Sequence, residues 1–303
     1  MCNLRQILRI LICGYLLLLQ LIMALNLKIL GIRSLSAVVF VIVLLGSVLW
    51  NYYSFTIFFF IVSLIGLNEF YKISEKLGAK PFKMVGYSLA SILYISFLNF
   101  DYLALVFKNA ELYKNVIVII FPFILLIIAL FSKNEKPIND LLYTVVGIFY
   151  AVIPFALLHQ FVIFKNEVLD DYQPLILIGI IFLIWSNDTF AYLGGSLFGK
   201  HKLIERISPG KTWEGTIFGI LVTFAISFLI KFYLLKTSGN LWPMLGIVVP
   251  ILATIGDLVE SMLKRQAGIK DSGNIMPGHG GVLDRFDSLI FVSPFVYVIF
   301  RLV

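Results

Sequence analysis

The polar residues best suited to chemistry lie near the C-terminal end of the chain, between residues 257 and 287. Four of them recur at three- and four-residue spacing, which places them on one face of a predicted helix. They are Asp257, Glu260, Ser261 and Lys264. Asp284 and Asp287 stand three apart where the next helix begins, so both can point to one side. Carboxylates without sulfur ligands suit Mg²⁺, and the set is typical of phosphoryl-type transfer.

The segment between these two helices is rich in glycine, so its backbone can approach a ligand closely. The basic residues around it are Lys264, Arg265, Lys270 and Arg285. The alternative is an ordinary loop with solvated charges, but carboxylates on both sides favour a binding loop. His279 lies between two glycines, and the only other histidines are in distant segments, so a zinc site is not expected. It could donate a hydrogen bond to phosphate or order the turn.

Asp188 stands within an otherwise apolar run, next to Asn187 and Thr189. A charged side chain at membrane depth costs about 2.5–3.5 kcal/mol on insertion scales, so it is retained when it pairs, binds an ion or lines water. The alternative role is a hydrogen bond to a neighbouring helix. The clustering of polar residues after residue 185 favours a site role for Asp188.

A third polar segment, Ser208-Pro-Gly-Lys-Thr212, precedes an apolar run. Pro209 and Gly210 predict a turn, which leaves Lys211 and Thr212 at a helix N-terminus, a favourable place for anions. A P-loop is excluded, because Glu205 stands where that motif needs glycine. Glu214 falls in the first helical turn, where pairing with the helix dipole is its expected role.

Composition places the chain in a membrane. Of its 303 residues 60% are hydrophobic and 14% charged, against about 45–50% and about 25% in soluble proteins. The net charge of +7 does not indicate nucleic-acid binding, because the basic residues lie in short gaps between apolar runs. The two cysteines, Cys2 and Cys13, are both near the N-terminus, so neither a disulfide framework nor a cysteine metal site is expected in the body.

Nine apolar segments are long enough to predict membrane-spanning helices, since a lone strand cannot satisfy its backbone in lipid. They are approximately 34–50, 52–71, 84–99, 115–131, 141–164, 174–193, 213–235, 243–263 and 288–303. The near absence of a connection at Asn51 predicts a tight hairpin. We expect one integral membrane domain over 1–303, with an N-terminal segment 1–33, scaffold helices over 34–180 and catalytic helices and loops over 181–303.

Lysine and arginine are distributed unevenly between the two sets of gaps. The gaps 26–33, 72–83, 132–140, 199–212 and 264–287 hold sixteen, and the opposite gaps hold four. By the positive-inside rule the first set, with both site loops, faces the cytoplasm. Either residues 7–25 form a tenth helix, or translation starts at Met23 and residues 1–22 are absent from the protein. Glu69, near the cytoplasmic end of the second helix, is interpreted as an interfacial residue.

The run from Ser261 to Asp287, with Lys264-Arg265, Lys270-Asp271, Pro-Gly-His-Gly-Gly over 277–281 and Asp284-Arg-Phe-Asp287, resembles the signature of the phosphatidate cytidylyltransferases. The segments 185–192 and 208–215 are similar to that family too, although Gly210 stands where the family often has lysine. The resemblance implies a multi-pass inner-membrane transferase of about nine helices, forming a homodimer. It also implies CTP and phosphatidate as substrates and Mg²⁺, with K⁺, as cofactors, and it maps the metal-holding aspartates onto Asp257 and Asp284.

The predicted reaction transfers CMP from CTP to phosphatidate, giving CDP-diacylglycerol and pyrophosphate. Catalytic roles are expected for Asp257, Lys264, Asp284, Arg285 and Asp287. Substrate contacts are expected for Asp188, Ser208, Lys211, Thr212, Arg265, Lys270 and His279. One alternative is a cytidylyltransferase for another lipid phosphate. Another is a cation-coupled transporter, which the one-sided distribution of polar residues disfavours.

Overall fold

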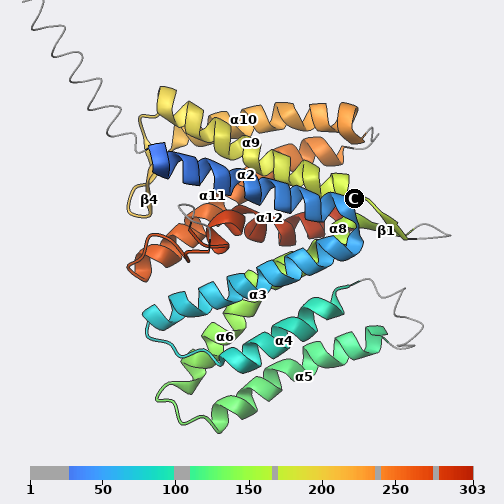
Figure 1. Ribbon diagram of the computed structural model, residues 1–303, viewed down its shortest axis with the longest axis vertical. Coiled ribbons are helices and arrows are strands. Elements are labelled where there is room, and N and C mark those ends of the chain that lie inside the picture. The colour runs from blue at the N-terminus through green and yellow to red at the C-terminus, as the bar shows by residue number, and fades with distance from the viewer. Residues whose placement is uncertain (1–26, 99–109, 166–169, 236–239, 276–279, 303) are drawn as a thin grey trace, which may run out of the picture.

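Most helices of the computed structural model lie side by side, with their axes close to parallel or antiparallel (Figure 1). The structure describes residues 27–98, 110–165, 170–235, 240–275 and 280–302. The segment 7–25 therefore lies outside the described residues, as does His279. Within these described ranges, five helices are long and apolar enough to cross a membrane. They are Tyr52–Lys76, Pro137–Val162, Pro174–Phe198, Trp213–Phe232 and Leu241–Gln266.

The first half of the chain forms the part of the bundle that carries α3, α4, α5 and α6 (Figure 1). Its elements are α2 (Leu27–Trp50), α3 (Tyr52–Lys76), α4 (Lys83–Ser96), α5 (Ala110–Leu130), α6 (Pro137–Ala151), α7 (Ile153–Leu157) and α8 (His159–Val162). The predicted hairpin at Asn51 is confirmed, since this one residue separates α2 from α3. Its Oδ1 accepts a hydrogen bond from Ser54 N at 2.8 Å and so caps α3.

The second half packs α9, α10 and α11 against one another, and α12 against α11. These elements are α9 (Pro174–Phe198), α10 (Trp213–Leu229), η2 (Ile230–Leu235, a π-helix), α11 (Leu241–Gln266) and α12 (Leu283–Leu302). α12 also contacts α3, α6 and α7, so it joins the two halves. Buried aromatic and aliphatic side chains such as Phe59, Phe155 and Phe286 fill this junction.

The sequence predicted helices in the apolar segments and no strands, and the structure adds two short strand pairs at connections between helices. β1 (Ile163–Lys165) pairs antiparallel with β2 (Asp170–Tyr172), and β3 (Lys202–Ile204) pairs with β4 (Ser208–Thr212). The predicted segment 141–164 largely coincides with the possible span Pro137–Val162, within which the helix is interrupted between α6, α7 and α8. Pro154 lies in the first turn of α7, where its missing N–H and its ring cannot continue α6.

The connections predicted to lie on one side of the membrane gather at one end of the bundle. Figure 1 shows the start of α2, the α3–α4 and α5–α6 connections, the β3–β4 hairpin and the loop before α12 at this end. The β1–β2 hairpin lies at the other end. This arrangement agrees with the alternation of lysine-rich and lysine-poor gaps in the sequence.

Candidate active site

A cavity of about 890 Å³ lies among α2, α9, β4, α10, α11 and α12. Most of the residues predicted to act in catalysis or binding line it. They are Asp188, Ser208, Lys211, Thr212, Asp257, Lys264, Asp284, Arg285 and Asp287. Apolar residues of α2 and α9, including Phe40, Leu44 and Ile181, line it as well. One cavity therefore combines charged groups with apolar surface.

Lys211 forms the contact between the β3–β4 hairpin and α11. Its Nζ lies 2.5 Å from Asp257 Oδ2, and Ser261 Oγ donates to Asp257 Oδ1 at 3.2 Å. The side chains of Lys211 and Asp257 are 25% and 35% exposed, so this ion pair can be reached from the cavity. A substrate phosphate can take the place of the Asp257 carboxylate beside Lys211. In the same way, a cation can take the place of Lys211 beside Asp257.

Lys264 is the counter-ion of two carboxylates. Its Nζ lies 2.6 Å from Asp284 Oδ1 and also contacts Glu260 Oε2, one helical turn earlier on α11. The three side chains are 14%, 6% and 1% exposed for Lys264, Asp284 and Glu260. The predicted polar face of α11 is confirmed by these contacts and by the Ser261–Asp257 hydrogen bond. Glu260 and Ser261 are the members of this face that received no site role from the sequence.

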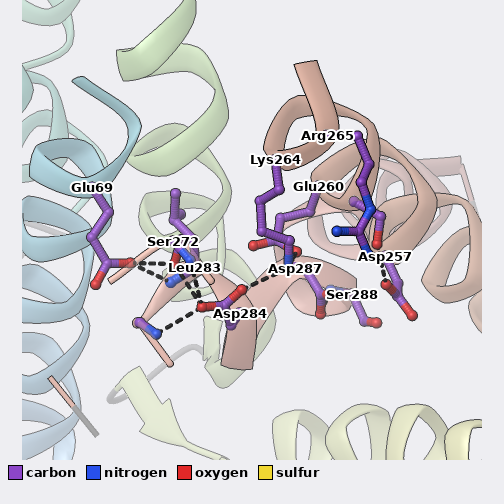
Figure 2. Close-up of polar contacts among 12 residues, drawn as sticks. Glu69, Asp257, Glu260, Lys264, Arg265, Ser272, Leu283, Asp284, Asp287 and Ser288 are labelled. Carbon is purple, nitrogen blue, oxygen red and sulfur yellow. Dashed lines mark hydrogen bonds and ion pairs between the residues drawn. The ribbon is translucent and has the colours of Figure 1, made fainter. Parts of the chain in front are cut away.

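Asp284 is held by the loop before α12 as well as by Lys264 (Figure 2). Its Oδ2 accepts hydrogen bonds from Ser272 N at 2.8 Å and from Gly281 N at 2.7 Å, and Ser272 Oγ lies 2.9 Å away. Burial would raise the pKa of Asp284, but Lys264 and these donors hold it below its ordinary value. Asp284 is therefore an anion with a fixed orientation.

Asp287 and Asp257 share one side of the cavity. Burial, followed by the nearby Asp257 carboxylate, raises the pKa of Asp287 to about 7, and Asp188 acts in the same direction. The positive charge of Lys211 opposes this rise in the pKa of Asp287. Carboxylates from α9, α11 and α12 thus line the cavity together with Lys211.

The helix start predicted at Lys211 and Thr212 is confirmed, because α10 begins at Trp213. Thr212 is the N-cap of this helix, and its Oγ1 accepts a hydrogen bond from Gly215 N at 3.2 Å. The residues before it form strand β4 rather than an isolated turn. Glu214 lies in the first turn, as the dipole interpretation requires, and it also accepts hydrogen bonds from Lys200 N and His201 N. These hydrogen bonds connect the start of α10 to the two residues directly before β3.

Replacing Thr212 with alanine is expected to lower the free energy of unfolding by about 1 kcal/mol, because the cap at Gly215 is lost. Thr212→Ser keeps the acceptor oxygen and should change stability by much less. Denaturant titration of the purified proteins in detergent measures both. Equal stability of the alanine and serine variants would contradict a capping role.

Two predicted substrate residues that the structure describes are not in the cavity lining. Arg265 and Lys270 are exposed and lie outside that lining, and His279 falls outside the described residues. Arg265 donates from Nε to the Ile207 carbonyl at 3.5 Å, toward the β3–β4 hairpin. Its side chain leaves the polar face of α11 because it follows Lys264 by one position, about 100° around the helix.

The interpretation of Glu69 as an interfacial residue is wrong. This residue of α3 is 2% exposed and accepts hydrogen bonds from Val282 N at 3.0 Å and Leu283 N at 2.9 Å. Ser272 Oγ lies 2.9 Å from its Oε2. The signal in the sequence was a carboxylate in an otherwise apolar helix, but nothing local identified its partners, more than 200 residues away.

The arrangement of the cavity agrees with what comparison of the whole sequence gives. A model of the cytidylyltransferase family matches residues 31–303. The chain belongs to the cytidylyltransferase family. The match covers both halves of the bundle and every cavity residue named above.

Three curated relatives of this cytidylyltransferase are all named phosphatidate cytidylyltransferase. The one from Staphylococcus haemolyticus (strain JCSC1435) is 33% identical over 271 residues, covering 88% of this chain and 98% of the relative. The one from Staphylococcus epidermidis (strain ATCC 12228 / FDA PCI 1200) is 33% identical over 274 residues with the same coverage. The one from Staphylococcus aureus (strain COL) is 38% identical over 179 residues, 58% of this chain and 65% of the relative. The last alignment thus spans just under two thirds of that relative.

Proposed function

We propose that this cytidylyltransferase transfers CMP from CTP to phosphatidate, giving CDP-diacylglycerol and pyrophosphate. The observation that carries the proposal is the single cavity in which Asp257, Asp284 and Asp287 meet Lys211 and Lys264 beside an apolar wall. The family match and the names of the relatives support the nucleotide and the lipid. Charged and apolar surfaces in one cavity suit a water-soluble triphosphate and a membrane lipid that must react together.

The reaction fits an in-line displacement at phosphorus. A phosphate oxygen of phosphatidate attacks the α-phosphorus of CTP, a new P–O bond forms, and the bond to the β-phosphate breaks as pyrophosphate leaves. The attacking oxygen is already anionic near neutral pH, so no strong general base is required. What the protein must supply is the means to bring several anions together.

The negative side of the cavity suits Mg²⁺, which uses one or two carboxylates and completes its ligands with water and substrate phosphates. Asp257 and Asp284 are the proposed ligands, helped by Asp287 or Asp188, and K⁺ is the proposed monovalent companion. Among the residues that the structure describes, no group of three or more histidine, cysteine or acidic side chains forms a complete metal cage. A bound Mg²⁺ would neutralise the phosphates and the departing pyrophosphate.

The cations of the cavity are proposed to hold phosphate. Lys211 lies beside the N-terminus of α10, with Ser208 and Thr212 on the same strand, and Lys264 and Arg285 line the other side. Arg265 and Lys270 are exposed, and their positive charges would attract the incoming triphosphate. His279 retains its proposed phosphate contact. Each group acts through position and charge, without a covalent intermediate.

We further propose the nine-helix topology in the inner membrane, with the cavity opening to the cytoplasm, where CTP is available. The gathering of the lysine-rich connections at one end of the bundle supports this orientation (Figure 1). A single membrane domain in which α2 to α8 act as a scaffold, and a homodimer of such domains, complete the proposal. The homodimer rests on the family resemblance alone.

Purified protein in detergent–phosphatidate micelles should convert radiolabelled CTP to a lipid-soluble product when Mg²⁺ is present and should stop when EDTA is added. A panel of other lipid phosphates offered in parallel identifies the preferred lipid. A monodisperse protein that gives no labelled lipid with any of them would contradict the proposal. Product formed from another lipid phosphate alone would keep the chemistry and replace the substrate.

A further inference from the structure

Glu69 stands out because its buried carboxylate accepts hydrogen bonds from the loop and helix start that hold Asp284. Val282 N donates to its Oε1 and Leu283 N to its Oε2. Ser272 Oγ, 2.9 Å from Oε2, is the third partner. A buried carboxylate is costly unless hydrogen bonds compensate it. The stability of this arrangement therefore depends on the loop staying in place.

The loop backbone is shaped around this carboxylate. A Cβ added at Gly273 or Gly281 would overlap the oxygens of Glu69, so neither position can carry a side chain without moving the loop or the carboxylate. Gly66, one helical turn before Glu69, receives the side chain of Leu283, because an added Cβ there would lie 3.2 Å from Leu283 Cδ2. The fit between α3 and the loop thus involves both backbone and side chains.

A continuous set of contacts leads from Glu69 to the cavity (Figure 2). Ser272 Oγ lies 2.9 Å from both Glu69 Oε2 and Asp284 Oδ2, and its single hydrogen can bond either carboxylate. Leu283, held through its N–H by Glu69, directly precedes Asp284. Asp284 then contacts Lys264 on α11. A displacement at Glu69 would be passed to Asp284 through two separate routes.

We propose that Glu69 is a positioning residue for the reaction, through which the scaffold helix α3 fixes the orientation of Asp284. The inference rests on the active site proposed above. Glu69 does not line the cavity, so it acts through Ser272 and the backbone of residues 282 and 283. The role needs a carboxylate in particular, because both oxygens accept hydrogen bonds. Glutamine would turn an N–H group toward one of these donors.

The Glu69→Gln variant of the full-length protein is expected to lose about 100-fold in kcat, the effect of a displacement near 1 Å at a reacting group. The KM for CTP should change much less, because Lys211 on β4 is not part of this set of contacts. Hydrogen–deuterium exchange should rise in peptides covering 269–285 and stay constant elsewhere. Glu75→Gln is the matched control, since it makes the same change on the same helix at an exposed carboxylate paired with Lys83.

The outcomes separate this inference from the proposed active site when Asp257→Asn is measured in parallel. Faster exchange with unchanged kcat in Glu69→Gln, while Asp257→Asn is inactive, would overturn the positioning role and leave the site standing. Unchanged exchange in 269–285 would overturn it as well. Activity retained in Asp257→Asn would contradict the site itself. If Glu69→Gln does not give monodisperse protein, Ser272→Ala removes the hydroxyl between Glu69 and Asp284 but keeps the backbone contacts, and it should lower kcat about tenfold, the value of one hydrogen bond. Wild-type kcat in Ser272→Ala would also overturn the inference.

Discussion

Asp284→Asn is expected to reduce the rate of CDP-lipid formation by about 100-fold or more. The substitution keeps the volume of the side chain and removes its charge. One oxygen of Asp284 faces Lys264 and the other faces Ser272 N and Gly281 N, so both oxygens must accept. An asparagine amide has one oxygen and would place its NH₂ group against one of these donors. The variant therefore loses a proposed metal ligand and the set orientation of the group together.

Initial rates with radiolabelled CTP, measured over a range of Mg²⁺ concentrations, test this expectation. Glu75→Gln removes a carboxylate from an exposed ion pair outside the cavity and should retain wild-type activity. Elution as a single species in size-exclusion chromatography confirms that both proteins are folded. If well-folded Asp284→Asn kept more than about a tenth of the wild-type rate, a role for Asp284 in holding the metal would be wrong.

Local sequence patterns were enough to identify the face of α11 and the start of α12. Asp257, Ser261 and Lys264 repeat with the period of a helix, and the structure brings them into contact with one another or with Asp284. The location of Lys211 and Thr212 before α10 also followed from Pro209 and Gly210, because these residues interrupt helices. Such predictions depend on neighbours within one or two turns, which a single sequence contains.

Contacts between distant segments could not be predicted in the same way. Glu69 and Ser272 are 203 positions apart, and a carboxylate near the end of an apolar helix is equally compatible with water or with a buried partner.

The strand pair β3–β4 was missed because its strands are short and carry no regular alternation. The helix predicted over 84–99 ends at Ser96, and it has 14 residues as α4, fewer than a typical span requires.

Replacing Lys264 with methionine is expected to reduce both the free energy of unfolding and the rate of CDP-lipid formation strongly. Glu260 and Asp284 are 1% and 6% exposed, and Lys264 lies between them. Its removal leaves two buried carboxylates without their common cation, which costs about 3–5 kcal/mol. The midpoint of unfolding in detergent should fall accordingly. Lys83→Met, which breaks the exposed pair with Glu75, is the matched control and should cost at most about 1 kcal/mol.

The double variant Lys264→Met/Glu260→Gln separates the two roles of Lys264. Removing the charge of Glu260 takes away one uncompensated carboxylate, so most of the lost stability should return. Activity should remain low, because the cavity still lacks the amine that contacts Asp284 and is proposed to hold phosphate. Recovery of both stability and turnover would mean that Lys264 serves only to neutralise Glu260. Failure of the double variant to recover stability would mean that Asp284, rather than Glu260, is the carboxylate that depends on Lys264.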